Sequence, residues 1–262
     1  MIRIGFLGAG NMAFAIAGAV SNKFDDSVIV PFDISDERIE LFKSSYGNVE
    51  PVSAAAELTD KCDILFLSVK PQMMKDAIEP LAGFSGLAVS IAAGLKISFF
   101  EQQMPSARIV RVMPNTPCLV GEMAAGYAPG RGVTSADLAL TDKILTAAGV
   151  AVAVEEEQID AVTGISGSGP AFLARIAEAF IDAGVESGLE PELARDLTLQ
   201  TMKGTAALLQ QKNMSPEELV KMVSSPNGTT VAGREILESS EYHDIIARTV
   251  ARTIERSKEL GK

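Results

Sequence analysis

The chain has few of the residues that form metal sites and charge-relay pairs. It contains one histidine, two cysteines and no tryptophan in 262 residues. Cys62 and Cys118 form no CxxC pair, and a single histidine cannot complete a common zinc ligand set, so we expect no bound metal. The histidine, His243, falls in a helical pattern near the C-terminus, where a role at the surface or core edge is expected.

Long hydrophobic runs and an excess of basic residues are also lacking. No apolar run reaches the roughly 18 residues of a membrane-spanning helix, so no membrane association is expected. The first residues enter a strand pattern directly, without the basic and apolar regions of a secretory signal. With two cysteines read as free thiols, this pattern predicts a cytoplasmic protein. The net charge of −11 favours solubility and argues against a nucleic-acid partner.

Hydrophobic residues make up 47% of the chain, enough for a sizeable core. In the first part, strand and helix patterns alternate, with strands expected at 2–7, 28–32, 64–69, 87–91, 109–112 and 150–154. This alternation predicts an α/β domain with a doubly wound, mostly parallel sheet over residues 1–156. Ligands of such a sheet bind beyond the carboxyl ends of its strands.

The second part, residues 157–262, lacks further strand signals and predicts an all-helical domain. Helices are expected at 171–186, 191–210, 216–223, 229–238 and 242–260. Ser215, Pro216 and Glu218 stand in the order of an N-cap, a first-turn proline and a capping-box glutamate. The helix around 171–181 is apolar over much of its circumference, which predicts burial against a partner chain.

A glycine-rich turn follows the first predicted strand and opens a helix. The glycines of Gly8-Ala9-Gly10 allow a tight turn and a close backbone approach to a pyrophosphate at the helix N-terminus. The pattern favours dinucleotide binding, although the same residues also suit an ordinary tight strand-to-helix turn.

Asp33 ends the second predicted strand, 25 positions after Gly8. A carboxylate there can accept hydrogen bonds from the ribose hydroxyls and repel a 2′-phosphate, which favours NADH. Ser35 and Arg38 lie close by in sequence and could accommodate a 2′-phosphate, which favours NADPH. Asp33 could also be a simple turn residue, so the cofactor is expected to be NADPH or NADH.

Three further strand ends carry polar or small residues in the right place to line a cofactor cleft: Ser68, Val69, Lys70 and Pro71; Ala92, Ala93 and Gly94; and Asn115. Lys70 could be catalytic, but a structural or cofactor-contact role is favoured. Asn115 could orient a carboxamide or merely end its strand.

Two polar turns precede helices in the second part of the chain. Residues 163–171 (TGISGSGPA) combine three glycines with two serines and predict an exposed turn whose N–H groups hold an anion. Residues 224–230 (SSPNGTT) have the same character and could hold a carboxylate. An interhelical linker and an ordinary helix cap are the respective alternatives.

Taken in order, these segments resemble the pyrroline-5-carboxylate reductase family. The resemblance rests on GFLGAGNM at 5–12, VKP at 69–71, SIAAG at 90–94, RVMPNTP at 111–117, DAVTGISGSGPA at 160–171 and SSPNGTT at 224–230. The last two are specific to the family, whereas the first is shared by many dehydrogenases.

The resemblance implies an enzyme that reduces Δ1-pyrroline-5-carboxylate to L-proline with NADPH or NADH, the last step of proline biosynthesis. It implies a Rossmann domain joined to a helical dimerisation domain, an active site shared between two subunits, and dimers that can assemble into decamers. Transferred to this chain, the cofactor contacts are Leu7, Gly8, Ala9, Gly10, Asn11, Met12, Ser68, Val69, Lys70, Pro71, Ala92, Ala93 and Gly94.

The substrate contacts implied by the resemblance are Ser225, Gly228, Thr229 and Thr230, with the Thr230 hydroxyl on the ring nitrogen as the catalytic contact. Two departures stand out. Asn227 replaces the usual glycine, and asparagine tolerates a left-handed backbone better than most residues. Residues 33–35 differ from the Ser/Thr-rich turn of NADPH-using members.

Two rivals remain for the function. A β-hydroxyacid dehydrogenase would share the architecture but needs a lysine on the helix after the glycine-rich turn, and residues 170–175 contain none. A dinucleotide-sensing protein without turnover would need no substrate turn at 224–230. Because the sequence offers no His–Asp or His–Glu pair for general acid catalysis, we expect catalysis by positioning, with the substrate entering already protonated.

Overall fold

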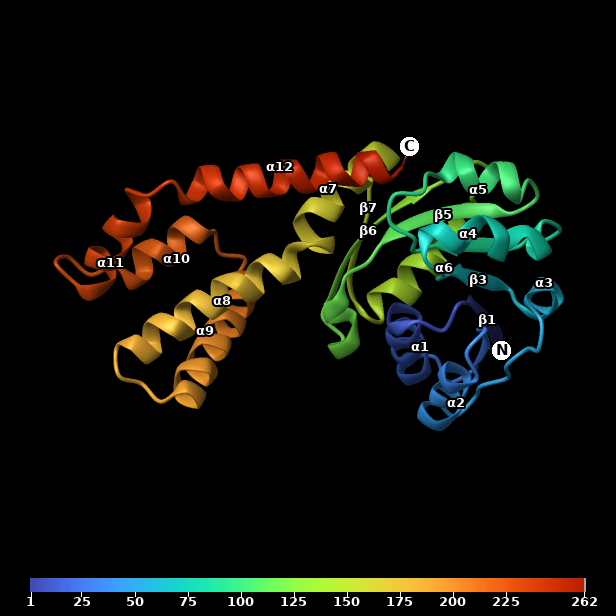
Figure 1. Cartoon of the computed structure of the whole chain (residues 1–262), viewed down its shortest axis with the longest axis horizontal. Helices are drawn as coiled ribbons and strands as arrows, with labels where there is room; N and C mark the ends of the chain where they lie inside the picture. Colours follow the sequence, from blue (N-terminus) through green and yellow to red (C-terminus); the bar gives the residue numbers. More distant parts are fainter. Residues whose placement is uncertain (262) are drawn as a thin grey trace. The chain divides into compact units, whose positions relative to one another are not determined.

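The computed structural model describes residues 1–261 and divides into two packed units (Figure 1). The sheet unit comprises Met1–Pro170 and Ala251–Lys262, and the helical unit comprises Ala171–Val250. The division by packing therefore differs from the expected boundary at 156/157. It also assigns the end of the last helix, from Ala251 onward, to the sheet unit.

The sheet unit is built on seven strands in the order β2-β1-β3-β4-β5-β6-β7. The first five pair in parallel, β6 runs antiparallel to β5, and β7 is parallel to β6. The strands are β1 (Ile2–Leu7), β2 (Ser27–Phe32), β3 (Ile64–Leu67), β4 (Leu87–Ser90), β5 (Arg108–Met113), β6 (Met123–Pro129) and β7 (Gly149–Ala153). The predicted doubly wound, mostly parallel sheet is confirmed. Strand β6 is an addition, because the sequence analysis placed no strand there.

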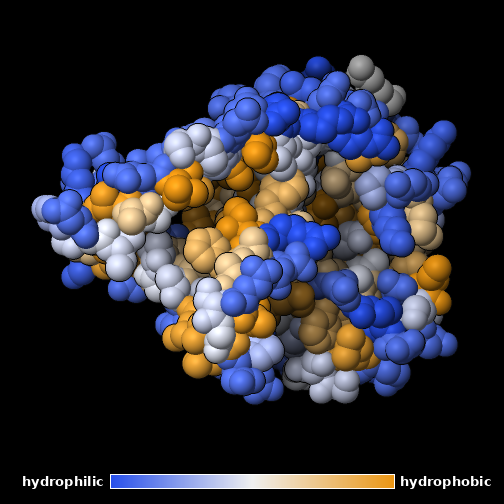
Figure 2. Space-filling model, turned by 60° about the vertical axis from the view of Figure 1, so that its left-hand side comes forward, coloured by the Kyte–Doolittle hydropathy of each residue, from blue (hydrophilic) through white to orange (hydrophobic). Residues whose placement is uncertain are grey.

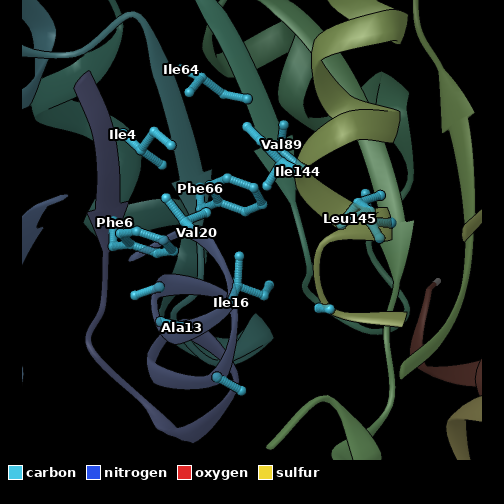
Figure 3. Packing of buried hydrophobic residues seen from close by; sticks show 14 of the residues in the cluster. Ile4, Phe6, Ala13, Ile16, Val20, Ile64, Phe66, Val89, Ile144 and Leu145 are labelled. Atoms are coloured by element: carbon cyan, nitrogen blue, oxygen red, sulfur yellow. The ribbon is translucent and has the colours of Figure 1, made fainter. Parts of the chain in front are cut away.

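Helices cover both faces of this sheet. The helices of the unit are α1 (Asn11–Lys23), α2 (Asp36–Ser45), α3 (Leu58–Lys61), α4 (Pro71–Ile78), α5 (Ile97–Gln103), α6 (Ser135–Thr146) and α7 (Ile159–Val162). Side chains of α1, α2 and α6 bury against one face, and those of α3, α4 and α5 against the other. Figure 3 shows the first cluster, where the rings of Phe6 and Phe66 stack with centroids 5.2 Å apart. Continuous apolar runs form the central strands because both faces are covered.

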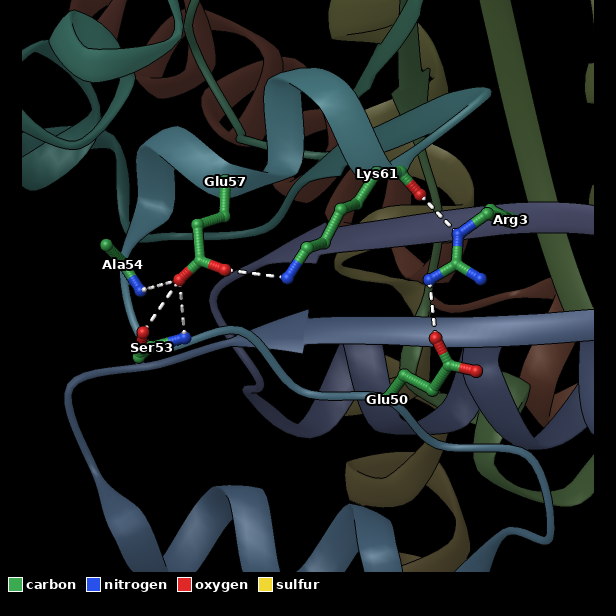
Figure 4. Close-up of polar contacts among 6 residues, drawn as sticks. All are labelled: Arg3, Glu50, Ser53, Ala54, Glu57 and Lys61. Carbon is green, nitrogen blue, oxygen red and sulfur yellow. Dashed lines mark hydrogen bonds and ion pairs between the residues drawn. The ribbon is translucent and has the colours of Figure 1, made fainter.

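Polar contacts hold the segment between α2 and β3 in place beside the sheet (Figure 4). Arg3 on β1 forms an ion pair with Glu50 at 2.6 Å and donates to the carbonyl of Lys61 at 2.7 Å. Glu57 accepts hydrogen bonds from Lys61 and from Ser53, which lower the pKa of the Glu57 carboxyl to about 2. These groups are exposed, so we assign them a role in loop placement rather than in stability.

The helical unit contains α9 (Pro191–Gln211), α10 (Pro216–Val223) and α11 (Thr229–Glu238), with most of α8 (Gly169–Glu186) and the first part of α12 (Tyr242–Leu260). All five expected helices are confirmed within one or two residues, including the capping box of α10. Across the described residues, no helix is both long and apolar enough to cross a membrane.

One expectation about the helical part was wrong. Residues 163–171 do not form an exposed turn, because η5 (Thr163–Gly167) continues α7 as a π-helical turn that leads into α8. The N–H of Ser168 donates to the carbonyl of Thr163 at 2.9 Å. The hydroxyls of Thr163 and Ser166 donate to carbonyls four residues earlier. These three donors are used within the helix, so they are not available to hold an anion as expected.

Candidate active site

The glycine-rich turn lies where β1 ends and α1 begins. Strand β2 flanks β1 on one side and β3 on the other, so this turn stands at the point where the chain order of the sheet reverses. Open α/β sheets bind ligands at such a point. The N–H of Gly8 donates to the carbonyl of Phe32 at 2.8 Å, and that of Ser68 to the carbonyl of Leu7 at 2.9 Å. The three strand ends are thus held together beneath the turn.

Gly8 and Gly10 need to be glycine for different reasons. Gly8 has φ of +93°, and a Cβ there would lie 2.8 Å from Val69 Cγ1. A side chain at Gly8 would therefore strain the backbone and collide with the segment that follows β3. Gly10 has an ordinary φ of −68°, and a Cβ there would meet nothing within 4 Å. Gly10 thus leaves open space above the turn, where a ligand can approach the backbone.

The N-terminus of α1 faces this space without a cap. Gly10 is its N-cap residue and provides no side-chain hydrogen bond, and the first turn contains no acidic residue. The N–H groups of Asn11, Met12 and Ala13 precede the first intrahelical bond, which Phe14 donates to Gly10 at 2.9 Å. An uncapped helix N-terminus with free N–H groups suits a pyrophosphate.

Asp33 is tied to the same turn. Its carboxylate accepts hydrogen bonds from the N–H of Ala9 at 2.7 Å and from the N–H of Ser35 at 2.9 Å. Arg38 Nε donates to the carbonyl of Ala9 at 2.6 Å, while its Nη2 is buried without a hydrogen-bond partner. Ser35 caps α2, as its hydroxyl accepts from the N–H of Arg38. The three predicted specificity residues therefore gather around one backbone turn.

The other expected cofactor residues lie at the neighbouring strand ends. Ser68 follows β3, and its hydroxyl is buried without a hydrogen-bond partner. Lys70 is exposed as the N-cap of α4, with Pro71 in the first position of that helix. Gly94, with φ of +81°, belongs to the turn that follows β4. The orphaned donors of Ser68 and Arg38 and the open space over Gly10 fit a dinucleotide.

Asn115 is placed at the end of β5 but is already engaged. Its side-chain amide donates to the carbonyl of Ser166 at 3.1 Å, and its side-chain oxygen accepts from the N–H of Ala124 at 2.9 Å. It is 7% exposed. The geometry shows Asn115 joining β5, β6 and η5, and a contact with the cofactor carboxamide stays a prediction.

The turn at 224–230 forms the start of α11 in the helical unit. Asn227 has φ of +57°, which confirms the left-handed conformation expected at this departure from the family pattern. Gly228 is the N-cap residue and provides no side-chain cap, so the N–H groups of Thr229 and Thr230 stay available. A Cβ on Gly228 would lie 2.5 Å from Ser225 Oγ, which brings this hydroxyl close to the uncapped helix start.

A positive charge stands beside this turn. Arg234, one turn further along α11, donates from Nη1 to the Ser224 hydroxyl at 3.4 Å and pairs with Glu238 at 3.2 Å. The sequence analysis missed this residue because nothing in its neighbourhood marks it. A helix N-terminus, two hydroxyls and a nearby guanidinium together suit a small carboxylate.

The remaining reactive side chains lie outside these two turns. His243 is exposed, and its ring packs on Tyr242 with centroids 4.1 Å apart, as expected of a surface residue. Burial raises the pKa of the Cys118 thiol to about 11 and that of the Cys62 thiol to about 12. Both cysteines are free, and their thiols stay protonated at neutral pH.

Two family models match the chain. Residues 156–260 match pyrroline-5-carboxylate reductase dimerisation, and residues 3–94 match NADP oxidoreductase coenzyme F420-dependent. Pyrroline-5-carboxylate reductase of Methanosarcina acetivorans is 37% identical, with 99% of this chain and 98% of the relative covered. That of Arabidopsis thaliana is 36% identical, with 99% and 96% covered. The chain belongs to the pyrroline-5-carboxylate reductase family.

Solved structures agree with this assignment. A pyrroline-5-carboxylate reductase from Coxiella burnetii has a TM-score of 0.94 at 32% identity, covering 100% of this chain and 99% of the other. The Plasmodium falciparum pyrroline carboxylate reductase, solved with NADP bound, has a TM-score of 0.85 at 31% identity, covering 100% and 98%. As a member of this family, the chain is an NAD(P)H-dependent oxidoreductase.

Proposed function

We propose that this pyrroline-5-carboxylate reductase family member reduces Δ1-pyrroline-5-carboxylate to L-proline. The observation that carries the proposal is the presence of two uncapped helix N-termini behind polar turns, one at Gly10 and one at Gly228. A dinucleotide phosphate suits the first and a substrate carboxylate the second. A reductase of a charged imine acid needs both, whereas a cofactor sensor needs only the first.

The sheet unit supplies the cofactor contacts in this proposal. The N–H groups at the start of α1 hold the pyrophosphate, and Asp33, Ser35 and Arg38 surround the adenosine ribose. Leu7, Ser68 to Pro71 and residues 92–94 line the cleft further along the strand ends. When bound, NADPH or NADH supplies the hydride that the reaction needs.

The helical unit supplies the substrate contacts. The hydroxyl of Ser225 and the N–H groups of Thr229 and Thr230 bind the carboxylate, while Gly228 leaves room for the Ser225 hydroxyl beside the helix start. The Thr230 hydroxyl lies against the ring nitrogen and orients the imine. It acts by positioning, because Thr230 is exposed at the second helical residue with no basic partner assigned to it.

The nitrogen of the product needs a proton, and the substrate brings it. An iminium accepts a hydride more readily than a neutral imine. The sole histidine lies on α12, where its ring packs at a tilt on Tyr242, and we assign it no part in proton transfer. The site therefore binds the protonated imine, and the Thr230 hydroxyl holds its ring nitrogen in the orientation needed for hydride transfer.

The dehydrogenase alternative finds no support in the geometry. Helix α8 contains no lysine between Gly169 and Glu186, and Arg175 is paired with Glu178 at 2.6 Å. A group that protonates an oxygen from this helix is therefore lacking.

The test is to mix the protein and NADPH with the cyclic imine and to follow the loss of nicotinamide absorbance. The proposal expects stoichiometric loss with L-proline as product. Absorbance that stays constant, with NADPH demonstrably bound, would favour the sensing role instead.

Self-association is the second part of the proposal. In the helical unit, Ala177 and Ala194 are the only buried residues, while Leu173, Phe180 and Ile236 are more than half exposed. Figure 2 shows such hydrophobic residues in patches on the visible face. Two buried alanines provide far too little core for 80 residues. The dimerisation model covers these same helices, so a second copy supplies the missing core.

The sheet unit carries a further uncovered apolar surface. A hollow of 380 Å³ lies over β6 and β7, and its walls include Val150, Val152 and Ile165. These three side chains are 57%, 55% and 66% exposed. The residues from α7 and η5 that line the hollow fall within the range matched by the dimerisation model, so the same partner is proposed to cover it.

A dimer of this kind shares its sites, with the 224–230 turn of one subunit serving the cofactor of the other. Mixing a Gly10→Ala subunit with a Thr230→Val subunit then regenerates one intact site in each mixed dimer, or about a quarter of all sites. If each site were confined to one chain, every mixture would show only the average of the two lowered activities. Decamers and a cytoplasmic location stay predictions from the sequence.

A further inference from the structure

A buried ion network connects four segments of the sheet unit. Arg111 on β5 is 3% exposed, and its guanidinium lies 3.3 Å from Glu156 Oε1 and 3.8 Å from Asp160 Oδ1. Asp160 in turn accepts a hydrogen bond of 2.6 Å from the Ser257 hydroxyl near the end of α12. A buried arginine is costly unless it is paired, and Glu156 and Asp160 provide its partners.

The network ends on both sides of one turn. Glu156 accepts a hydrogen bond of 2.7 Å from the N–H of Ile97, the first residue of α5. Because α5 follows residues 92–94 in the chain, Glu156 holds the backbone in place where it leaves this turn. At the other side, Ser257 fixes the end of α12, which reaches the same turn three residues later at Leu260.

The contact between α12 and the turn is close. A Cβ on Gly94 would lie 3.1 Å from Leu260 Cβ and 3.3 Å from the Leu260 carbonyl oxygen. A Cβ on Gly261 would overlap the carbonyl oxygen of Gly94. With φ of +81°, Gly94 holds a backbone conformation that glycine readily adopts, and no other residue would fit between the turn and α12. The end of α12 therefore packs directly on the backbone of this turn.

We propose that Arg111 and Ser257 are positioning residues for cofactor binding, because they hold the end of α12 and the start of α5 against the turn at 92–94. The inference rests on the proposed contact between this turn and the cofactor. Neither side chain touches the cofactor in this account. Arg111 orients Glu156 and Asp160, and Ser257 connects Asp160 to the helix that packs on Gly94.

The test uses Ser257→Ala in the full-length protein, with Ser187→Ala as the matched control. Ser187 is exposed just after α8, and its hydroxyl donates a hydrogen bond to the carbonyl of Ala183 in the last turn of that helix. The measurements are the NADPH dissociation constant by fluorescence titration, the kinetic constants, and amide hydrogen exchange over residues 92–97.

We expect Ser257→Ala to raise the NADPH dissociation constant on the order of fivefold, as loss of one hydrogen bond to a carboxylate permits. Exchange at 92–97 should quicken. The KM for the imine and kcat at saturating NADPH should stay within about twofold, a split that general destabilisation would not produce. Ser187→Ala should match the wild type in all three measurements.

A second variant checks the chain of contacts. Arg111→Met should weaken NADPH binding in the same direction, and the double variant should lose less than the product of the two single effects, because both act through Asp160. If Arg111→Met does not fold, Ser257→Ala decides alone. An unchanged NADPH dissociation constant and unchanged exchange in Ser257→Ala would overturn the proposal, whereas failure of the wild type to bind NADPH would overturn the proposed function instead.

Discussion

The carboxylate of Asp33 accepts a hydrogen bond from the N–H of Ala9 at 2.7 Å, across the glycine-rich turn. Each carboxylate oxygen carries two lone pairs, so this contact leaves acceptor sites for ribose hydroxyls. Arg38 donates a hydrogen bond of 2.6 Å from Nε to the carbonyl of the same residue, Ala9. A negative and a positive group thus contact one turn, and we expect their balance to influence the choice between NADH and NADPH.

Asp33→Asn should shift the choice of cofactor toward NADPH. The variant keeps an oxygen acceptor but removes the charge that repels a 2′-phosphate and strengthens the ribose contact. We expect the ratio of kcat/KM for NADPH to that for NADH to rise roughly tenfold. Steady-state kinetics with both cofactors measure the ratio, and a ratio equal to that of the wild type would remove Asp33 from the ribose site.

Arg38→Met should shift the same ratio in the opposite direction. Its buried Nη2 has no hydrogen-bond partner in the protein and is the donor available for a phosphate oxygen. The affinity for NADPH should fall at least tenfold, with a smaller loss for NADH. Equal losses for both cofactors would mean that Arg38 only supports the turn.

The two glycines of the turn should respond differently to alanine. Gly10→Ala meets no atom within 4 Å, so the variant should fold with a cost of about 1 kcal/mol or less for the cap, while NADPH binding falls at least tenfold. Gly8→Ala meets Val69 at 2.8 Å with φ of +93°, so it should lower the melting temperature strongly. Thermal unfolding and NADPH titration of both variants test this contrast, which fails if Gly10→Ala binds NADPH normally.

Thr230→Val should lower turnover more than cofactor affinity. The change removes the hydroxyl proposed for the ring nitrogen but preserves shape and the helix N–H groups. We expect kcat to fall roughly tenfold with an unchanged NADPH dissociation constant. Thr205→Val, at an exposed position of α9, is the control. Wild-type kinetics in Thr230→Val would place the hydroxyl outside the site.

The Arg108–Asp137 pair should make stability depend on acid pH. Arg108 donates two hydrogen bonds to Asp137, at 2.8 and 3.0 Å, and these lower the pKa of the carboxyl from 3.8 to about 2. A depressed pKa contributes stability that is present above the unfolded value and is lost as pH falls from about 4 to about 2. The contribution is roughly 1–2 kcal/mol for this largely buried carboxyl.

Denaturant unfolding at several pH values checks this. Asp137→Asn should lower the free energy of unfolding at neutral pH. It should also reduce the loss of stability between about pH 4 and about pH 2, the interval between the unfolded and folded pKa values of Asp137. Asp25→Asn, exposed before β2, should keep the slope of the wild type. If the stability of Asp137→Asn falls as steeply with acid pH as that of the wild type, other carboxyl groups cause the acid dependence.

Much of the fold was predictable because its signals are local. In the sequence, buried parallel strands appear as apolar runs, and a capping box predicts the start of α10. Strand β6 was not predicted, because its sequence, MAAGYAP, consists largely of small residues with low strand propensity. The pairing of β6 with β5 and β7 supplies what its own residues do not.

The site was only partly predictable for a similar reason. The glycines, Asp33 and the turn at 224–230 lie in short motifs with a known chemistry. Residues 163–171 misled because glycine and serine favour turns, whereas here the hydroxyls of Thr163 and Ser166 bond back along a helix. The network of Arg111 and Ser257 joins residues far apart in sequence, and no local pattern predicts it.

The central claim is that hydride passes from the nicotinamide to the imine carbon of Δ1-pyrroline-5-carboxylate. The most direct measurement is to run the reaction with NADPH carrying deuterium at the transferable position and to analyse the product by NMR and mass spectrometry. The account predicts L-proline with one deuterium on the carbon that was doubly bonded to nitrogen. Proline without deuterium, or NADPH left unoxidised in the presence of the imine, would contradict it.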